Sequence, residues 1–257
     1  MKQESEKVLI PAVPLRGGVV FPGVTTTISI GRPRSLAAAK AAHREEGEIL
    51  ILVQYDPEVE EPGREDLAPI GVLANVRDLL RTSQLGVQML VEMRRRVLVD
   101  ELNIDQPYLT ATYGPLEDTT DAAAPELMAE SIAYIEQYIE TLGEVNRQVL
   151  ATLRGKETAG ELADFLAGLL NMPFELELDL LNSLHGVERL SRVRDFLEQE
   201  LRIAEIRSKI QQDAQEGASQ AQREYLLREQ MKAIQKELGE DDAALSDDLQ
   251  IKIGQAG

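Results

Sequence analysis

The chain has 257 residues, of which 43% are hydrophobic, and this content is enough to build one large domain or two ordinary ones. It carries 45 acidic and 27 basic residues, and the resulting net charge of -18 disfavours nucleic acid and anionic membranes, because phosphate groups are bound mainly through positive charge. It contains no cysteine, which excludes disulfides, thiol nucleophiles and thiolate metal sites.

Residues 1–117 are predicted to form a β-rich lobe. Short apolar runs such as 'VTTTISI', 'EILILVQY' and 'VQMLVEM' alternate with turn sequences such as 'FPG' and 'TSQLG', which is typical of a mostly antiparallel sheet. One helix interrupts the strands in 'RPRSLAAAKAAHREEG', where Pro33 suits the first turn and Gly47 is placed to end it.

Residues 118–185 are predicted to form an α-helical bundle, because after the polar segment 'LEDTTDAAAP' the apolar period changes from two toward 3.6. A long helix follows over residues 186–240, and residues 241–257 are expected to be a linker. At roughly fifty residues and ~1.5 Å per residue, this helix is about 75 Å long. Its first half can pack on the bundle through Leu190, Val193, Leu197 and Leu201, and the second half is expected to project. The predicted fold class is therefore α+β.

Residues suited to catalysis or metal binding are nearly absent from the sequence. It contains no 'GxxxxGK[ST]' phosphate loop, and His43 and His185 each lack a partner at metal-ligand spacing. The basic run from Arg94 to Arg96 is interpreted as a solvated strand end. We expect no catalytic residue, no metal and no cofactor in this chain. No segment has the length of a signal peptide or a membrane span, so we expect a cytoplasmic protein without a membrane partner.

Two groups of apolar residues are candidates for binding another polypeptide. In the β lobe these are Phe21, Pro22, Met89 and Met93, for which anchoring in the core is the alternative interpretation. On the second half of the long helix they are Tyr225, Leu226, Leu227 and Met231, for which a seam between helices is the alternative.

The oligomer seam itself follows spacings of three and four along the long helix. Its candidate residues are Ile206, Ile210, Ala214, Gly217, Ala221, Ile234 and Leu238. Gly217 is unfavourable in a helix by roughly 1 kcal/mol relative to alanine, so we expect a helix that continues through this position but is softened there.

Several motifs resemble the N-terminal region of the Lon family of ATP-dependent proteases. These are 'PLRGGVVFPGV', 'GREDLAPIGVLANV', 'QMLVEMRRRV', 'NMPFELELDLLNSLHGVERL' and 'AQREYLLREQMKAIQKELGEDD'. The resemblance implies a parent protease with an ATPase module that uses ATP and Mg, and a serine–lysine peptidase module, neither of which is in this sequence. It also implies a cytoplasmic homohexamer for protein quality control and the stress response, which degrades misfolded, damaged and selected regulatory proteins.

Two functions are consistent with these observations. The first is a non-catalytic module that recognises substrates by binding exposed apolar segments of unfolded polypeptides, and that supports the oligomer. The second is a purely structural oligomerisation or spacer module, whose long helix sets the geometry of a ring. A nucleic-acid partner is not expected, because of the net charge.

Overall fold

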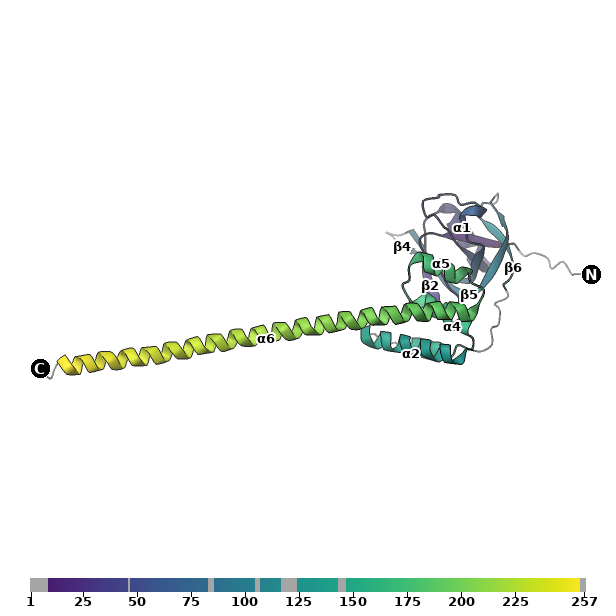
Figure 1. Cartoon of the computed structure of the whole chain (residues 1–257). Helices are drawn as coiled ribbons and strands as arrows, with labels where there is room; N and C mark the ends of the chain where they lie inside the picture. The colour runs from purple at the N-terminus through teal and green to yellow at the C-terminus, as the bar shows by residue number, and fades with distance from the viewer. Residues whose placement is uncertain are drawn as a thin grey trace, which may run out of the picture. The chain divides into compact units, whose positions relative to one another are not determined.

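The computed structural model describes residues 9–45, 47–82, 86–104, 107–116, 124–142 and 147–254 (Figure 1). Six strands and one helix are followed by five further helices, so the predicted α+β class is confirmed. The strands are β1 (Ile10–Leu15), β2 (Thr25–Ile30), β3 (Glu48–Val53), β4 (Ile70–Thr82), β5 (Gly86–Asn103) and β6 (Thr110–Pro115). A short 3₁₀ turn, η1 (Arg64–Asp66), precedes β4.

The sheet has the strand order β2-β5-β4-β3-β1-β6, and β5 also pairs with β6. This second pairing closes a ring of five strands and leaves β2 outside it, bound to the first half of β5. Only β1 and β3 are parallel, and the other pairs are antiparallel, as the sequence predicts. Register shifts at Leu73/Ala74, Val76/Asp78 and Val99/Glu101 mark bulges, which increase the local twist of the long strands.

The apolar run of β3 explains why the sheet is buried on both faces. Ile49, Ile51 and Val53 point into one core cluster, and Leu50 and Leu52 point into a second one inside the ring. A strand covered on both faces reads as a continuous apolar run and not as an alternating one. The sequence 'EILILV' therefore belongs to a strand with core on both of its faces.

The first helix, α1 (Pro33–Arg44), begins and ends as the sequence predicts. Pro33 occupies the first turn, where its missing N–H costs nothing. At the other end, the backbone N–H of Gly47 donates to the carbonyl of Ala42 over 2.9 Å. The helix covers the sheet with Ala38, Ala39 and Ala42, whose small side chains are buried.

The later helices are α2 (Pro125–Leu142), α3 (Arg147–Arg154), α4 (Ala159–Leu169), α5 (Phe174–Asn182) and α6 (Gly186–Gly254). Thr158 caps α4 by accepting a hydrogen bond from the backbone N–H of Glu161 over 3.2 Å. The first turns of α6 carry Leu190, Val193, Leu197 and Leu201, which are buried as predicted. Among the helices of the described residues, none combines the length and apolar content that crossing a bilayer requires.

The chain divides into two compact units, residues 1–201 and residues 202–257. Within the first unit, one core cluster contains Phe21 and Ile28 from the strand region together with Leu162 and Leu197 from the helices. The lobe of residues 1–117 and the bundle of residues 118–185 therefore share a core, and the segment 117–123 between them lies outside the described residues.

Helix α6 is longer than predicted. It continues past residue 240 to Gly254, so residues 241–254 of the expected linker are helical, and residues 255–257 lie outside the described part (Figure 1). The reason is local, because 'EDDAALSDDLQIKIG' contains good helix formers and no proline, and a single Gly239 lowers helix stability without ending the helix. The helix also continues through Gly217, as predicted.

Candidate functional site

The apolar turn around Phe21 is part of the core. Phe21 is only 1% exposed, and Pro22 is half-buried. Gly23 has a positive φ of 82°, and it binds the turn to β5, because its N–H donates to the Met93 carbonyl over 3.0 Å. The Met93 N–H in turn donates to the Val24 carbonyl over 2.9 Å. The turn therefore directs its aromatic ring inward.

The two methionines of β5 are also buried in the core. Met89 and Met93 are 0% and 2% exposed and belong to the core cluster that contains Phe21. Their candidate role as exposed contact residues is therefore corrected, as it is for Phe21. A chain with four phenylalanines and no tryptophan needs its few large apolar side chains for the core.

In helix α6, by contrast, many of the candidate apolar side chains are exposed to water. Seven large apolar side chains between residues 206 and 234 are 54–64% exposed, namely Ile206, Ile210, Tyr225, Leu226, Leu227, Met231 and Ile234. Ala214 is also exposed, whereas the side chains of Ala221 and Leu238 lie outside the described residues. The spacing of Leu227, Met231 and Ile234 aligns them on one face of the helix. The structure thus leaves these apolar side chains in water. We call the seven large ones, from Ile206 to Ile234, the α6 apolar row.

The structure contains a buried cluster of ion pairs that the sequence does not predict. Arg96, the last residue of the basic run expected to be solvated, is only 6% exposed. Its Nε lies 3.4 Å from Oδ2 of Asp164 on α4, and Nε of Arg189 on α6 lies 3.1 Å from Oδ1 of the same carboxylate. The other two arginines of the run follow different patterns, since Arg94 pairs with Glu92 at 2.8 Å and Arg95 lies 5.6 Å from the centre of the Tyr113 ring.

Backbone carbonyls at the end of α5 complete this cluster. Arg96 donates to the carbonyls of Leu181 and Ser183 over 3.0 and 2.7 Å, and Arg189 donates to the Ser183 carbonyl over 2.9 Å. The carbonyl end of a helix carries partial negative charge, so it suits two guanidinium groups that share one carboxylate. The cluster joins β5, α4, α5 and the start of α6, and we interpret it as a structural anchor.

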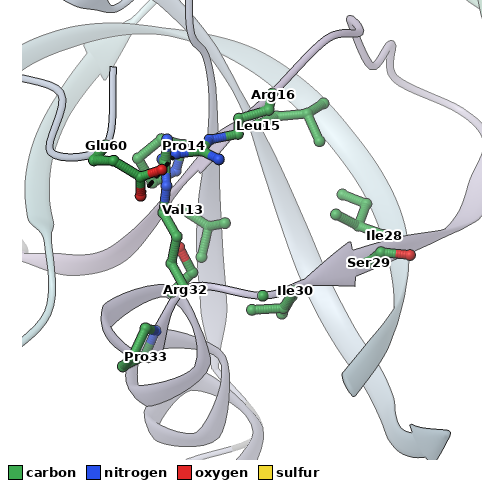
Figure 2. A pocket seen from close by; sticks show the side chains of 12 residues that line it. Val13, Pro14, Leu15, Arg16, Ile28, Ser29, Ile30, Arg32, Pro33 and Glu60 are labelled. Carbon is green, nitrogen blue, oxygen red and sulfur yellow. Dashed lines mark ion pairs between the residues drawn. The ribbon is translucent and has the colours of Figure 1, made fainter. Parts of the chain in front are cut away.

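A cavity of about 350 Å³ lies between β1 and β2 (Figure 2). Val13 and Leu15 line it from β1, and Ile28 and Ile30 line it from β2. Figure 2 shows Arg32 and Glu60 on the side of the cavity away from Ile28. Glu60 pairs with Arg16 at 3.1 Å. The cavity therefore has an apolar part and a charged part.

Arg32 is held at the charged part by Nη2, which donates to Oε1 of Gln54 over 2.9 Å and to the Val59 carbonyl over 2.7 Å. Burial lowers the pKa of its guanidinium, and repulsion from Arg16 lowers it further, while Glu60 acts in the opposite direction. Nε and Nη1 of Arg32 are buried without an acceptor among the described residues. Arg32 thus contributes a partly buried positive charge beside Arg16 at this part of the cavity.

Metal-ligating side chains do not gather in the described ranges, where no cluster of three His, Cys, Asp or Glu residues has a suitable geometry. His43 lies on α1 and His185 lies between α5 and α6, and both are exposed. Two other features of the described residues could contact a ligand, namely the exposed α6 apolar row and the cavity between β1 and β2.

The comparisons with known proteins agree with this fold. The family model of the ATP-dependent protease La (LON) substrate-binding domain matches residues 9–199, and the chain belongs to this family. The resemblance to the Lon family is therefore confirmed.

Individual relatives extend the match over almost the whole chain. Lon protease 4 of Sorangium cellulosum is 36% identical over 96% of this chain and 31% of its own length. Lon protease 1 of Bacillus subtilis is 30% identical over 99% of this chain and 33% of its own length. The chain thus spans about a third of the length of these relatives.

A solved structure supports the fold alone, because its sequence identity is low. The N-terminal domain of the Mycobacterium avium complex Lon protease has a TM-score of 0.56 at 19% identity, with 74% of this chain and 98% of that chain covered.

Proposed function

We propose that this chain is a non-catalytic substrate-recognition region of an ATP-dependent protease. It binds exposed apolar segments of unfolded polypeptides and supports assembly of the protease. The observation that carries the proposal is the α6 apolar row, present in a chain that belongs to the Lon substrate-binding family. Pro22, half-buried on the turn that anchors Phe21, is retained as a secondary contact.

The physical basis of this recognition is the exposed apolar surface that distinguishes a misfolded protein from a native one. A misfolded chain leaves apolar area in water, and burial of that area yields roughly 25 cal/mol per Å². The α6 apolar row has the complementary property, because its side chains are more than half exposed. A flexible methionine and amphipathic tyrosine among them suit contacts with many different sequences.

The same row supports self-association. Side chains at spacings of three or four run from Ile206 through Ile210 to Ala214, and again from Leu227 through Met231 to Ile234, and a second helix could cover such a seam. We propose that this seam helps to hold a homohexamer together, with Gly217 as a softer point in it. A purely structural function, in which α6 only sets ring geometry, rests on the same observation and is the second candidate.

The parent protein is proposed to act in the cytoplasm in protein quality control and the stress response. Its substrates would be misfolded, damaged and selected regulatory proteins. Catalysis would belong to an ATPase module that uses ATP and Mg and to a serine–lysine peptidase module.

Binding of one protein in its unfolded and its native form tests the first function. The chain should bind the unfolded form at least tenfold more tightly, as measured by fluorescence anisotropy. A variant with Tyr225→Ser, Leu227→Ser and Met231→Ser should lose most of this preference. The control has Gln222→Ser, Arg228→Ser and Gln230→Ser, which change exposed polar side chains of the same helix segment. Equal binding of the unfolded and native forms contradicts the proposal.

Light scattering separates the second function from the first. The 257-residue chain should associate, and the serine variant of the α6 apolar row should shift toward a monomer, whereas the polar control should not. Self-association without any preference for unfolded protein favours the purely structural function. A chain that is monomeric at all concentrations removes it.

A further inference from the structure

Strand β2 is an open edge of the sheet. It pairs with β5 from Thr25↔Glu92 to Ile30↔Val87, and in the described part of the chain it has no strand on its other side. Ile28 and Ile30 are buried, whereas Thr25, Thr27 and Ser29 are exposed. An open edge offers backbone N–H and C=O groups to which an extended polypeptide can add as a further strand.

The cavity between β1 and β2 lies directly beside this edge. Its volume of about 350 Å³ is at the lower end of the range of roughly 300–1,000 Å³ found for small-ligand sites. Val13, Leu15, Ile28 and Ile30 supply its apolar part. Its size and lining suit one apolar side chain of a polypeptide that lies along β2.

The charged part of the cavity favours a carboxylate. Arg16 and Arg32 lie near each other, and Glu60 pairs with Arg16 through a side chain that is 78% exposed. Such an exposed ion pair contributes little and can exchange partners. Arg16 is the more exposed of the two arginines and can donate to a carboxylate, while the partly buried Arg32 adds a second positive charge beside it.

We propose that this cavity binds the C-terminal residue of a polypeptide. The backbone of the bound chain extends along β2, its last side chain enters the apolar part, and its terminal carboxylate binds Arg16 beside the positive charge of Arg32. The net charge of -18 repels segments rich in Asp and Glu. An apolar C-terminal residue brings one carboxylate and one apolar group on the same Cα, and therefore matches both parts of the cavity.

This inference rests on the proposed function and deepens it. The α6 apolar row selects polypeptides by exposed apolar area, which is spread along an unfolded chain. The cavity would select one end of that chain. The two sites differ in chemistry, because only the cavity distinguishes a free carboxylate from its amide.

The test uses the 257-residue chain and three fluorescently labelled ten-residue peptides. The first ends in leucine with a free carboxylate, the second is its C-terminal amide, and the third is the amide with one internal glutamate. Fluorescence anisotropy should show at least tenfold tighter binding of the free acid than of either amide. Equal affinities for the acid and the first amide overturn the proposal, and so does binding of the glutamate peptide as tight as that of the acid.

Variants locate the effect at the cavity. Arg32→Gln should reduce the acid-to-amide ratio to below twofold, and Arg32→Lys should retain part of it. Lys40→Gln, on α1 and outside the cavity lining, removes the same charge and should leave the ratio unchanged. A ratio unchanged by Arg32→Gln overturns the assignment to this cavity. Circular dichroism checks folding, since Arg32 also binds Gln54 and Val59.

Failure of the cavity proposal can be distinguished from failure of the proposed function. Loss of the acid-to-amide difference with continued preference for unfolded protein rejects the cavity alone. Absence of any preference for unfolded protein rejects the proposed function itself.

Discussion

The two units of the chain differ in how they place the same kinds of residue, because the first unit buries them and the second leaves them exposed. In the first unit, leucines of α6 such as Leu190 and Leu197 are fully buried, and even the charged Arg96, Asp164 and Arg189 lie inside, paired with one another. In the second unit, Leu227 on the same helix is 60% exposed. One helix therefore contains both a core segment and a segment whose apolar side chains have no cover within their own unit.

This difference indicates which unit can be stable alone. The first unit has a continuous core, and its buried charges are matched by opposite charge or by backbone carbonyls. An isolated helix gains little from packing, and most helical stability in proteins comes from covering an apolar face. We therefore expect that the second unit is stabilised by a partner, and the following changes test the contrast.

The largest expected effect is at the buried ion cluster. Asp164→Asn removes the one carboxylate that Arg96 and Arg189 share, and leaving buried charge uncompensated should lower the free energy of unfolding by about 3–5 kcal/mol. Urea denaturation followed by circular dichroism measures this. Asp195→Asn, which breaks an ion pair with Arg194 at an exposed carboxylate, is the control and should cost less than about 1 kcal/mol. Similar losses in both variants would show that the cluster is not an anchor.

A matched pair of leucines on α6 tests the contrast directly. Leu197→Ala empties a fully buried position and should cost about 2–5 kcal/mol. Leu227→Ala truncates an exposed side chain and should change the stability of the dilute chain by no more than about 0.5 kcal/mol. If Leu227→Ala has the larger effect at low protein concentration, the α6 apolar row is already covered within one chain.

A smaller effect is expected at Gly217. Gly217→Ala should stabilise the helix by about 1 kcal/mol, because alanine loses less backbone entropy than glycine. Hydrogen exchange should slow across residues 210–225 and remain unchanged in the first unit. Equal exchange in the two proteins would contradict a softened helix at this position.

The smallest effect concerns Glu177 on α5. Burial raises the pKa of its carboxyl, although backbone N–H groups of Val19 and Met172 act against the shift. A raised pKa in the folded state means that ionisation opposes folding, and this penalty disappears as the pH falls through the raised value. Glu177→Gln should therefore stabilise the protein at neutral pH by about 0.5 kcal/mol or less, since the group is partly exposed. Denaturation at neutral and acidic pH should show that the gain vanishes in acid.

Much of the fold could be predicted because it depends on local patterns. The Pro33 and Gly47 signals located α1, and the burial of Leu190 and Leu197 followed from their helical spacing. The closure of the ring could not be predicted, since it depends on β5 continuing for 18 residues to pair with both β4 and β6. From sequence, the two halves of β5 read as separate apolar runs.

The candidate site was predicted less completely, for reasons of long-range contact. The turn sequence allows Phe21 either to be exposed or to be anchored in the core, and the positive φ of Gly23 and its hydrogen bond to Met93 direct the ring inward. Arg96 looked solvated within 'RRR', but its acceptors lie on α4 and at the end of α5, about seventy residues or more along the chain. The α6 apolar row was found because residues at helical spacing need no distant partner to be recognised.

The ion cluster at the start of α6 also has a mechanical consequence. Arg189 enters the helix one turn after Gly186, and through Asp164 and the carbonyl of Ser183 it is connected to α4, α5 and, by Arg96, to the long strand β5. Tension applied to α6 would therefore be distributed over several helices and strand β5 at once, and would not act on a single strand of the sheet.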